Sequence, residues 1–269
     1  MIQKSKTIRI VKRENPPLKS IISFPNSFRF GCEFEFYIIG NNCDNIIDEL
    51  KAISGSDILI NLDEIPSEKD AHNCLCLKFD SSLGTSGVEI SIPICSYHTL
   101  FYYISRITYI IEEYGTTNED TGFHIHISTN EDIEMDFYAF LLICNNKNLL
   151  NNWGERNGYS LNPMEILNYC YEEEARNLKN KKGRIWSIER RDKSHIEIRT
   201  MGGVGYHNKA HQIIEELDIF VSTFKKTLED MSGDEEYKSI LREHLIELKN
   251  TTIEKTKKFQ DFIRTINPI

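Results

Sequence analysis

The sequence lacks the features that would place the protein in a membrane or along a nucleic acid. No apolar run among its 269 residues approaches the roughly 18 that a membrane-spanning helix needs. The first 19 residues are basic but contain no apolar core of a secretory signal. The formal charge of -9 argues against broad phosphate-backbone binding, which requires clustered Lys and Arg. These absences predict no membrane span and no extended nucleic-acid contact.

Seven cysteines are present, but their spacing forms neither a disulfide framework nor a zinc knuckle. Their number is odd, and they are scattered through apolar segments. Cys74 and Cys76 are one residue apart, whereas a zinc knuckle uses Cys-x-x-Cys. A chain of this length can also bury a sizeable core without disulfide bonds. This pattern indicates a reduced, cytoplasmic protein.

Apolar runs bounded by turn residues predict that the first part of the chain is rich in strands. No internal repeat and no long flexible linker interrupts it. Strands are expected at 28–39, 75–79, 87–94 and 122–129, and a hairpin of 185–187 and 195–200 is expected across Arg190 to Lys193.

Apolar residues at helical spacing predict helices between and after these strands. They are expected at 44–53, 97–114, 132–152 and from Pro163 to about residue 181. Two amphipathic helices are expected from Asn208 onward, with a break at Ser232-Gly233. Their periodicity indicates that they cover the core or present a surface to a partner.

Four of the expected strands place ionisable residues at every second position. Residues i and i+2 of a strand share one face of the sheet. Apolar side chains fill the opposite face of each strand, as in Cys32-Glu33-Phe34-Glu35-Phe36. The residues of the polar faces are Glu33 and Glu35, Glu89 and Ser91, His124 and His126, and His195, Glu197 and Arg199.

A single strand of this kind is explained by a water-facing side of an antiparallel sheet. The four together are harder to explain that way, because their polar faces carry no Lys. Carboxylates that converge raise one another's pKa unless cations compensate. Imidazoles and carboxylates together bind divalent metals, and a mainly carboxylate set favours Mg²⁺ or Mn²⁺ over structural zinc. The pattern therefore predicts a metal site, provided that the strands are neighbours.

A second group of residues is cationic and lies mainly outside these faces. Each member alone is explained as a surface charge in a weak ion pair. Together with Arg199 they could bind phosphate oxygens, for which the planar fork of arginine is suited. Such a site needs no glycine-rich phosphate loop, and the chain has no GxxxxGK[ST] motif. The group consists of Arg156, Lys182, Arg184, Arg190 and Arg191.

The ordered motifs GxExE, D-x-S, E-xxx-P, GxHxH, R-N-x-Y and ExR resemble those of the amidoligase family. That family is a branch of carboxylate–amine ligases within the glutamine synthetase and glutamate–cysteine ligase superfamily. The matching stretches span about residues 28 to 205 and are Gly31 to Glu35, Asp80 to Ser82, Glu89 to Pro93, Gly122 to His126, Arg156 to Tyr159 and Glu197 to Arg199.

The resemblance implies an α+β fold with a curved, mostly antiparallel sheet of the glutamine synthetase type, roughly barrel-like and backed by helices. It implies an amidoligase-like catalytic domain over 1–206, with C-terminal helices over 207–269 packed on the same domain. Two or three metals would lie in the sheet, with ATP at one mouth.

The resemblance also implies roles for individual residues. Glu33, His124 and Glu197 would bind one metal near the phosphates, and Glu35 and Glu89 would bind another near the substrate. Asp80 would face the substrate or a metal-bound water. The residues that would approach the nucleotide phosphates are His126, Arg156, Arg184 and Arg199.

The implied reaction is ATP-dependent ligation of a small-molecule or peptide carboxylate to an amine through an acyl phosphate. Mg²⁺ or Mn²⁺ and the arginines, among them Arg156 and Arg199, would stabilise the transferring phosphoryl group. A carboxylate such as Asp80 would take the proton of the incoming ammonium. Two alternatives stay open, a metal-dependent hydrolase and an inactive interaction protein that retains the fold.

One motif departs from the family pattern. Ile92 precedes Pro93 where the family usually has serine, and Ser91 is displaced by one residue. This displacement changes the face that the serine occupies, so we assign Ser91 no role. Residues Gly202 to Gly205, which follow the last strand, are predicted to form a plain turn; the alternative is a mobile loop near the site.

Overall fold

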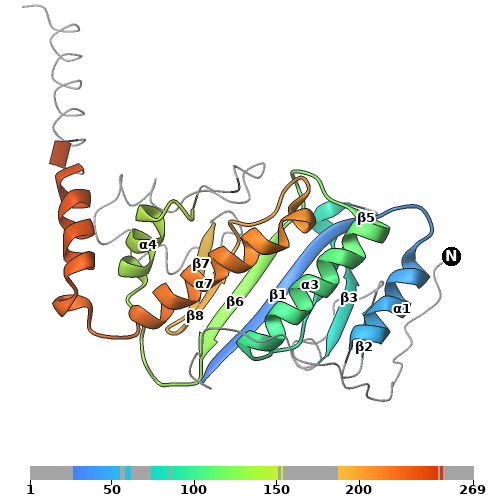
Figure 1. Cartoon of the computed structure of the whole chain (residues 1–269), viewed down its shortest axis with the longest axis horizontal. Coiled ribbons are helices and arrows are strands. Elements are labelled where there is room, and N and C mark those ends of the chain that lie inside the picture. Colours follow the sequence, from blue (N-terminus) through green and yellow to red (C-terminus); the bar gives the residue numbers. More distant parts are fainter. Residues whose placement is uncertain are drawn as a thin grey trace, which may run out of the picture.

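A mixed sheet with helices against one of its faces organises the protein (Figure 1). The computed structural model describes residues 27–54, 58–61, 74–84, 86–150, 153, 187–247 and 249–250. The predicted helix after Pro163 and the predicted strand start at 185–186 lie outside the described residues, as do Arg156, Lys182 and Arg184.

The sheet has eight strands in the order β2-β3-β4-β1-β6-β8-β7, with the short β5 paired to β1. All pairings are antiparallel except the parallel pair of β2 and β3. The path ends at β2 and at β7, so the described strands form an open sheet and not the roughly closed barrel that the resemblance implied. The strands are β1 (Phe28–Ile38), β2 (Ile58–Asn61), β3 (Leu75–Phe79), β4 (Gly87–Ser91), β5 (Gly115–Thr116), β6 (Phe123–Thr129), β7 (Ile188–Asp192) and β8 (His195–Ile198).

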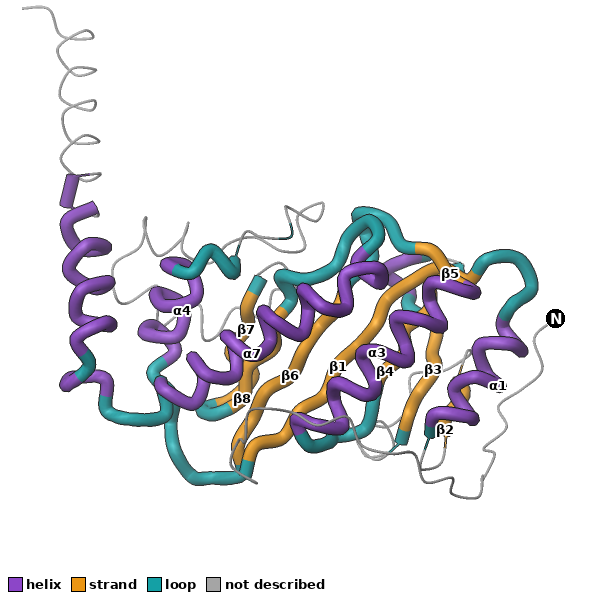
Figure 2. The backbone as a smooth tube through the Cα atoms, viewed as in Figure 1, coloured by secondary structure: helices purple, strands orange, loops and turns teal. Residues whose placement is uncertain are grey.

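The helices α1, α3 and α7 lie across one face of the sheet (Figure 2). The named helices are α1 (Cys43–Ile53), α3 (Tyr97–Tyr114), α4 (Phe137–Asn146) and α7 (Ala210–Lys226), and a further helical segment covers 235–247. Single 3-10 turns occur at η1 (Ser81–Leu83), η2 (Tyr206–Lys209) and η3 (Met231–Gly233). None of the described helices is long and apolar enough to cross a bilayer.

The hydrophobic core lies between the sheet and these helices. Alternate residues of β1, including Phe28, Phe30 and Phe34, are buried on this side. The Phe34 ring lies 4.8 Å from that of Phe123 on β6, and the Phe28 ring lies 5.5 Å from that of Phe224 on α7. The apolar half of the alternating pattern therefore faces the helices, and the polar half faces the other side of the sheet.

The predicted α+β class and most of the strands and helices are confirmed, but three local predictions were wrong. The helix expected at 132–152 begins only at Phe137, because the Asp136 side chain accepts a hydrogen bond of 2.9 Å from the Ala139 N–H and caps it there. In the hairpin, Arg190 lies in β7 and not in the turn, because β7 continues to Asp192 and Arg190 pairs with Ile196 of β8. The short strands β2 and β5 were not predicted.

Gly115, where α3 ends and β5 begins, offers a test of this packing. A Cβ atom there would lie 2.6 Å from Cδ2 of the buried Phe36 and 3.2 Å from the Ile111 carbonyl oxygen. We expect Gly115→Ala to lower the free energy of unfolding by about 1–3 kcal/mol, measured by urea denaturation. Gly233→Ala is the control, because its Cβ would meet nothing within 4 Å. Equal losses in the two variants would contradict the close approach at Gly115.

Candidate metal centre

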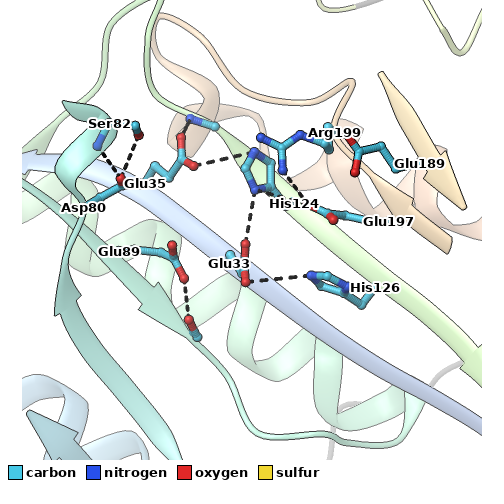
Figure 3. Close-up of polar contacts among 12 residues, drawn as sticks. Glu33, Glu35, Asp80, Ser82, Glu89, His124, His126, Glu189, Glu197 and Arg199 are labelled. Atoms are coloured by element: carbon cyan, nitrogen blue, oxygen red, sulfur yellow. Dashed lines mark hydrogen bonds and ion pairs between the residues drawn. The ribbon is translucent and has the colours of Figure 1, made fainter. Parts of the chain in front are cut away.

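The polar halves of four strands meet on the face of the sheet opposite α3 and α7. The strand order β4-β1-β6-β8 makes these strands direct neighbours, as the metal prediction required. Glu33 on β1 is opposite Ser91 on β4 and His124 on β6. Glu35 is opposite Glu89 on β4. Pairs in register share a face, so the register alone gathers these side chains (Figure 3).

The first cluster consists of Glu33, His126 and Glu197, whose ligand atoms all lie within 4.8 Å of one another. The His126 Nε2 atom is 3.8 Å from Glu33 Oε1. The family resemblance implied that His124 belongs to this group and that His126 approaches the nucleotide. In the structure, His124 lies beside the group, with its Nδ1 atom 3.2 Å from Glu33 Oε2 and 3.8 Å from Glu197 Oε1.

The second cluster consists of Glu35, Asp80 and Glu89, again with ligand atoms within 4.8 Å of one another. Each carboxylate is fixed through one oxygen. Glu35 Oε2 accepts a hydrogen bond of 2.6 Å from the Gly122 N–H. Asp80 caps η1, and its Oδ1 atom accepts bonds of 2.8 Å and 2.7 Å from the N–H and the hydroxyl of Ser82. The predicted pair Glu35 and Glu89 is therefore brought together, with Asp80 as a third member.

His124 lies between the two clusters and is only 2% exposed. Its Nδ1 atom faces Glu33, and its Nε2 atom is 3.6 Å from Glu35 Oε1. Nε2 is buried and has no hydrogen-bond partner among the residues that the structure describes. A buried imidazole nitrogen without a partner is costly unless an ion or a ligand satisfies it. This atom is an independent sign that the face is built to hold a further group.

Carboxylates outnumber cations on this face. The pKa of Glu33 lies well below its ordinary value because, although burial raises it, hydrogen bonds to His124 and His126 outweigh the burial. Burial also raises the pKa of Glu197, and the nearby imidazoles and Arg199 bring it below the usual range. Both groups are thus ionised at neutral pH. The carboxylates are Glu33, Glu35, Asp80, Glu89, Glu189 and Glu197, and the cations are Lys78, Arg191 and Arg199.

Arginines flank the first cluster. The Arg199 Nη1 atom donates a hydrogen bond of 2.5 Å to Glu197 Oε1, and the Arg199 side chain is buried. The Arg191 Nε atom lies 3.1 Å from Glu197 Oε2. Of the arginines predicted to meet phosphates, the structure therefore brings Arg199 and Arg191 to the site.

Lys78 on β3 belongs to the site and was missed by the sequence reasoning. Its ammonium nitrogen is 2.8 Å from Glu89 Oε1, because Lys78 and Glu89 are paired in register. The alternation of Cys76 and Lys78 within Leu75 to Phe79 was the available signal. The polar faces of the four predicted strands carry no Lys, but β3 lies beside β4 and contributes Lys78 to the same face.

Two further sequence predictions can be compared with the structure. The Ser91 hydroxyl, to which no role was assigned, donates a hydrogen bond of 2.5 Å to Glu89 Oε1 and so orients that carboxylate. Gly202 forms a bridge with Gly122, and the Gly203 N–H donates to the Thr121 carbonyl at 2.8 Å. Residues 202–205 are therefore bonded to the start of β6, next to Glu35, as a turn.

The donor set fits divalent cations. Two clusters of carboxylate and imidazole ligands share one face of the sheet, where each ligand is buried or half-buried and carboxylates are in excess. Among the described residues, His124 Nε2 has no hydrogen-bond partner. No protein-family model matches the chain, and no curated protein matches it either. The fold and the site thus define a class, an α+β protein with a candidate two-metal centre on one sheet face.

The pKa of Glu89 provides a test by pH. Burial and the nearby Glu33 carboxylate raise the pKa of Glu89 to about 7 from 4.5. Folded protein therefore holds a proton that the unfolded chain has released, and the stability present below pH 4.5 is lost as the pH rises through about 7. Glu89→Gln removes this loss. We expect the variant to gain about 1–3 kcal/mol relative to wild type between pH 5 and 8, measured by urea denaturation in EDTA.

Glu113→Gln, on an exposed position of α3, controls for the loss of one carboxylate. Its stability difference from wild type should stay nearly constant over the same pH range. Parallel pH profiles for Glu89→Gln and wild type would contradict the raised pKa.

The assignment of the imidazole ligand is tested by Mn²⁺ binding, counted as free Mn²⁺ by electron paramagnetic resonance. We expect His126→Asn to weaken Mn²⁺ binding at the first cluster by about tenfold or more, because His126 is the imidazole within that cluster. His124→Asn is the matched comparison. A larger loss in His124→Asn than in His126→Asn, with both variants folded, would restore the assignment of His124 made from the sequence.

Proposed function

We propose that the protein is an ATP-dependent carboxylate–amine ligase that uses Mg²⁺ or Mn²⁺ and forms an amide through an acyl phosphate. Its substrates would be a small-molecule or peptide carboxylate and an amine. The observation that carries the proposal is the pair of acidic clusters on one sheet face, with arginines beside the first cluster.

The two clusters supply the ligands that this reaction needs. Glu33, His126 and Glu197 would hold one divalent cation, with His124 adjacent, and Glu35 and Glu89 would hold the other, with Asp80 beside them. Cations bound there would neutralise the negative charge of a phosphoryl group during its transfer. The arginine side of the first cluster makes it the nucleotide side, and the second cluster is then the side of the carboxylate and amine.

The side chains of the second cluster differ in their access to a substrate. Glu35 and Glu89 are buried, whereas Asp80 is half-buried. The bonds from Ser82 to Asp80 Oδ1 hold this carboxylate in one orientation. Asp80 is therefore the best placed of the three to take a proton from an incoming ammonium, as a general base.

The reaction would proceed in two steps. An oxygen of the substrate carboxylate attacks the γ-phosphorus of ATP, and ADP leaves. The amine then attacks the acyl carbon, phosphate leaves with the carbon–oxygen bond electrons, and one proton passes to the base. The protein provides charge stabilisation and positioning, and no side chain needs to act as a nucleophile.

The order of the motifs supports this reading over its alternatives. The GxExE, D-x-S, E-xxx-P, GxHxH and ExR segments fall on β1, η1, β4, β6 and β8, which adjoin one site. Because of this motif order, our proposal includes a glutamine synthetase-like sheet and membership of the amidoligase family. A metal-dependent hydrolase would use the same ligands but would bring no nucleotide phosphate for the exposed guanidinium of Arg191 to bind. In a protein without activity, the buried carboxylates would lower the stability of the fold and serve no function.

Calorimetric titration with ATP tests the nucleotide site. We expect wild type to bind ATP only when Mg²⁺ is present, and Glu197→Gln to weaken this binding by about tenfold or more, because the metal ligand set is broken. Glu113→Gln should bind as wild type does. Absence of ATP binding with either Mg²⁺ or Mn²⁺ would overturn the ligase proposal and favour the hydrolase.

Trapping with hydroxylamine tests the acyl phosphate. Hydroxylamine is a small nucleophilic amine that converts an acyl phosphate to a hydroxamate. We expect incubation with ATP, Mg²⁺ and pools of carboxylates to give a hydroxamate with wild type and none with Glu197→Gln. ATP hydrolysis without any hydroxamate across the pools would contradict the proposed intermediate.

A further inference from the structure

Arg190 and Arg191 are neighbours in β7, yet their side chains leave the strand on opposite sides. Arg190 is in register with Ile196 and so shares the face that packs against the helices. Arg191 lies at the irregularity of the ladder between Arg190 and Asp192. Its guanidinium reaches Glu189 and Glu197 on the face of the candidate metal centre. The two arginines therefore have different surroundings.

Arg190 is engaged by the hairpin itself. Its Nε atom donates to the Asp192 carbonyl at 3.0 Å, and its Nη2 atom donates to Glu134 Oε1 at 2.6 Å. Only 10% of its side chain is exposed. These bonds fasten the β7–β8 hairpin to the segment before α4. A ligand would have to break them to use this guanidinium.

Arg191 is held in place but remains accessible. The Nη1 atom is 2.9 Å from Glu189 Oε2, and the Nε atom is 3.1 Å from Glu197 Oε2. Its Nη2 atom has no hydrogen bond to any residue that the structure describes, and 45% of the side chain is exposed. Two carboxylates thus orient the guanidinium from one side, and its Nη2 atom can donate a hydrogen bond to a ligand.

Arg199 is the other arginine beside Glu197, and it is enclosed. It is only 8% exposed, and its Nη1 atom is bonded to Glu197 Oε1. Arg199 therefore contributes charge and orients Glu197, while Arg191 offers donors to a ligand. The planar guanidinium fork matches the oxygens of a phosphate group. Because Arg191 also touches Glu197, a phosphate that meets it would lie next to the first cluster.

We propose that Arg191 is the residue that binds the polyphosphate of the nucleotide at the first cluster, and that Arg190 only fastens the hairpin. The inference rests on the proposed ATP-dependent function and assigns the phosphate contact within it. It assigns the phosphate contact to Arg191 and not to the enclosed Arg199, for which the ExR motif implied such a contact.

Titration calorimetry with ATP and with inorganic tripolyphosphate, each at saturating Mg²⁺, tests the assignment. We expect Arg191→Gln to weaken both ligands by about 10-fold to 100-fold, which corresponds to the loss of one or two charge-assisted hydrogen bonds. Arg191→Lys should fall between this variant and wild type, because it keeps the charge but loses the fork. Arg190→Gln should leave both affinities within about threefold of wild type while lowering the melting temperature.

Mn²⁺ binding without any phosphate ligand separates this role from a structural one. Arg191→Gln should bind Mn²⁺ at least as tightly as wild type, since removal of a cation cannot weaken a neighbouring cation site by charge. A folded Arg191→Gln that binds tripolyphosphate as wild type does would overturn the inference.

The failure of the two proposals can be told apart. If wild type binds tripolyphosphate but not ATP, the ligase proposal is wrong. The tripolyphosphate affinity of Arg191→Gln relative to wild type would still decide the role of Arg191. Wild type that binds neither ligand would overturn both.

Discussion

Glu33 and Glu35 reach the face of the candidate metal centre only while β1 keeps its register with β4 and β6. A slip by one residue would turn these carboxylates toward the helices and would bring Phe34 to the opposite side. The buried rings of Phe34 and Phe123, in contact at 4.8 Å, make such a slip very costly. The core thus holds the acidic face in place, and the chemistry on one side of the sheet depends on the packing on the other.

The same arrangement carries an energetic conflict. Buried carboxylates repel one another, and burial alone disfavours their charged forms. The imidazoles, Lys78, Arg191 and Arg199 offset part of this repulsion, but burial and then the charge of Glu33 still raise the pKa of Glu89. A site of this kind is less stable empty than filled. Ligand binding and folding are therefore linked, and divalent cations should act on the stability of the whole sheet.

The sequence allowed the faces of the strands to be predicted but not every neighbour. The period of two in β1, β4, β6 and β8 is a local property, so the alternating pattern placed Glu33, Glu89, His124 and Glu197 on one side. The order of the strands is set by contacts far apart in the chain, and it is why Lys78 on β3 was overlooked. The choice between His124 and His126 depends on distances of a few ångströms between side chains, which no spacing in the sequence determines.

β1 sets the distance between the two acidic clusters. It contributes Glu33 to one cluster and Glu35 to the other, and two residues of an extended strand span about 6.6–6.8 Å. The spacing of the two clusters is thereby set by the covalent backbone and not by loops. Turns at the ends of the strands, such as η1, can vary in sequence without altering that spacing. The distance between the two clusters is therefore a property of β1, whereas the residues of the turns decide what surrounds the clusters.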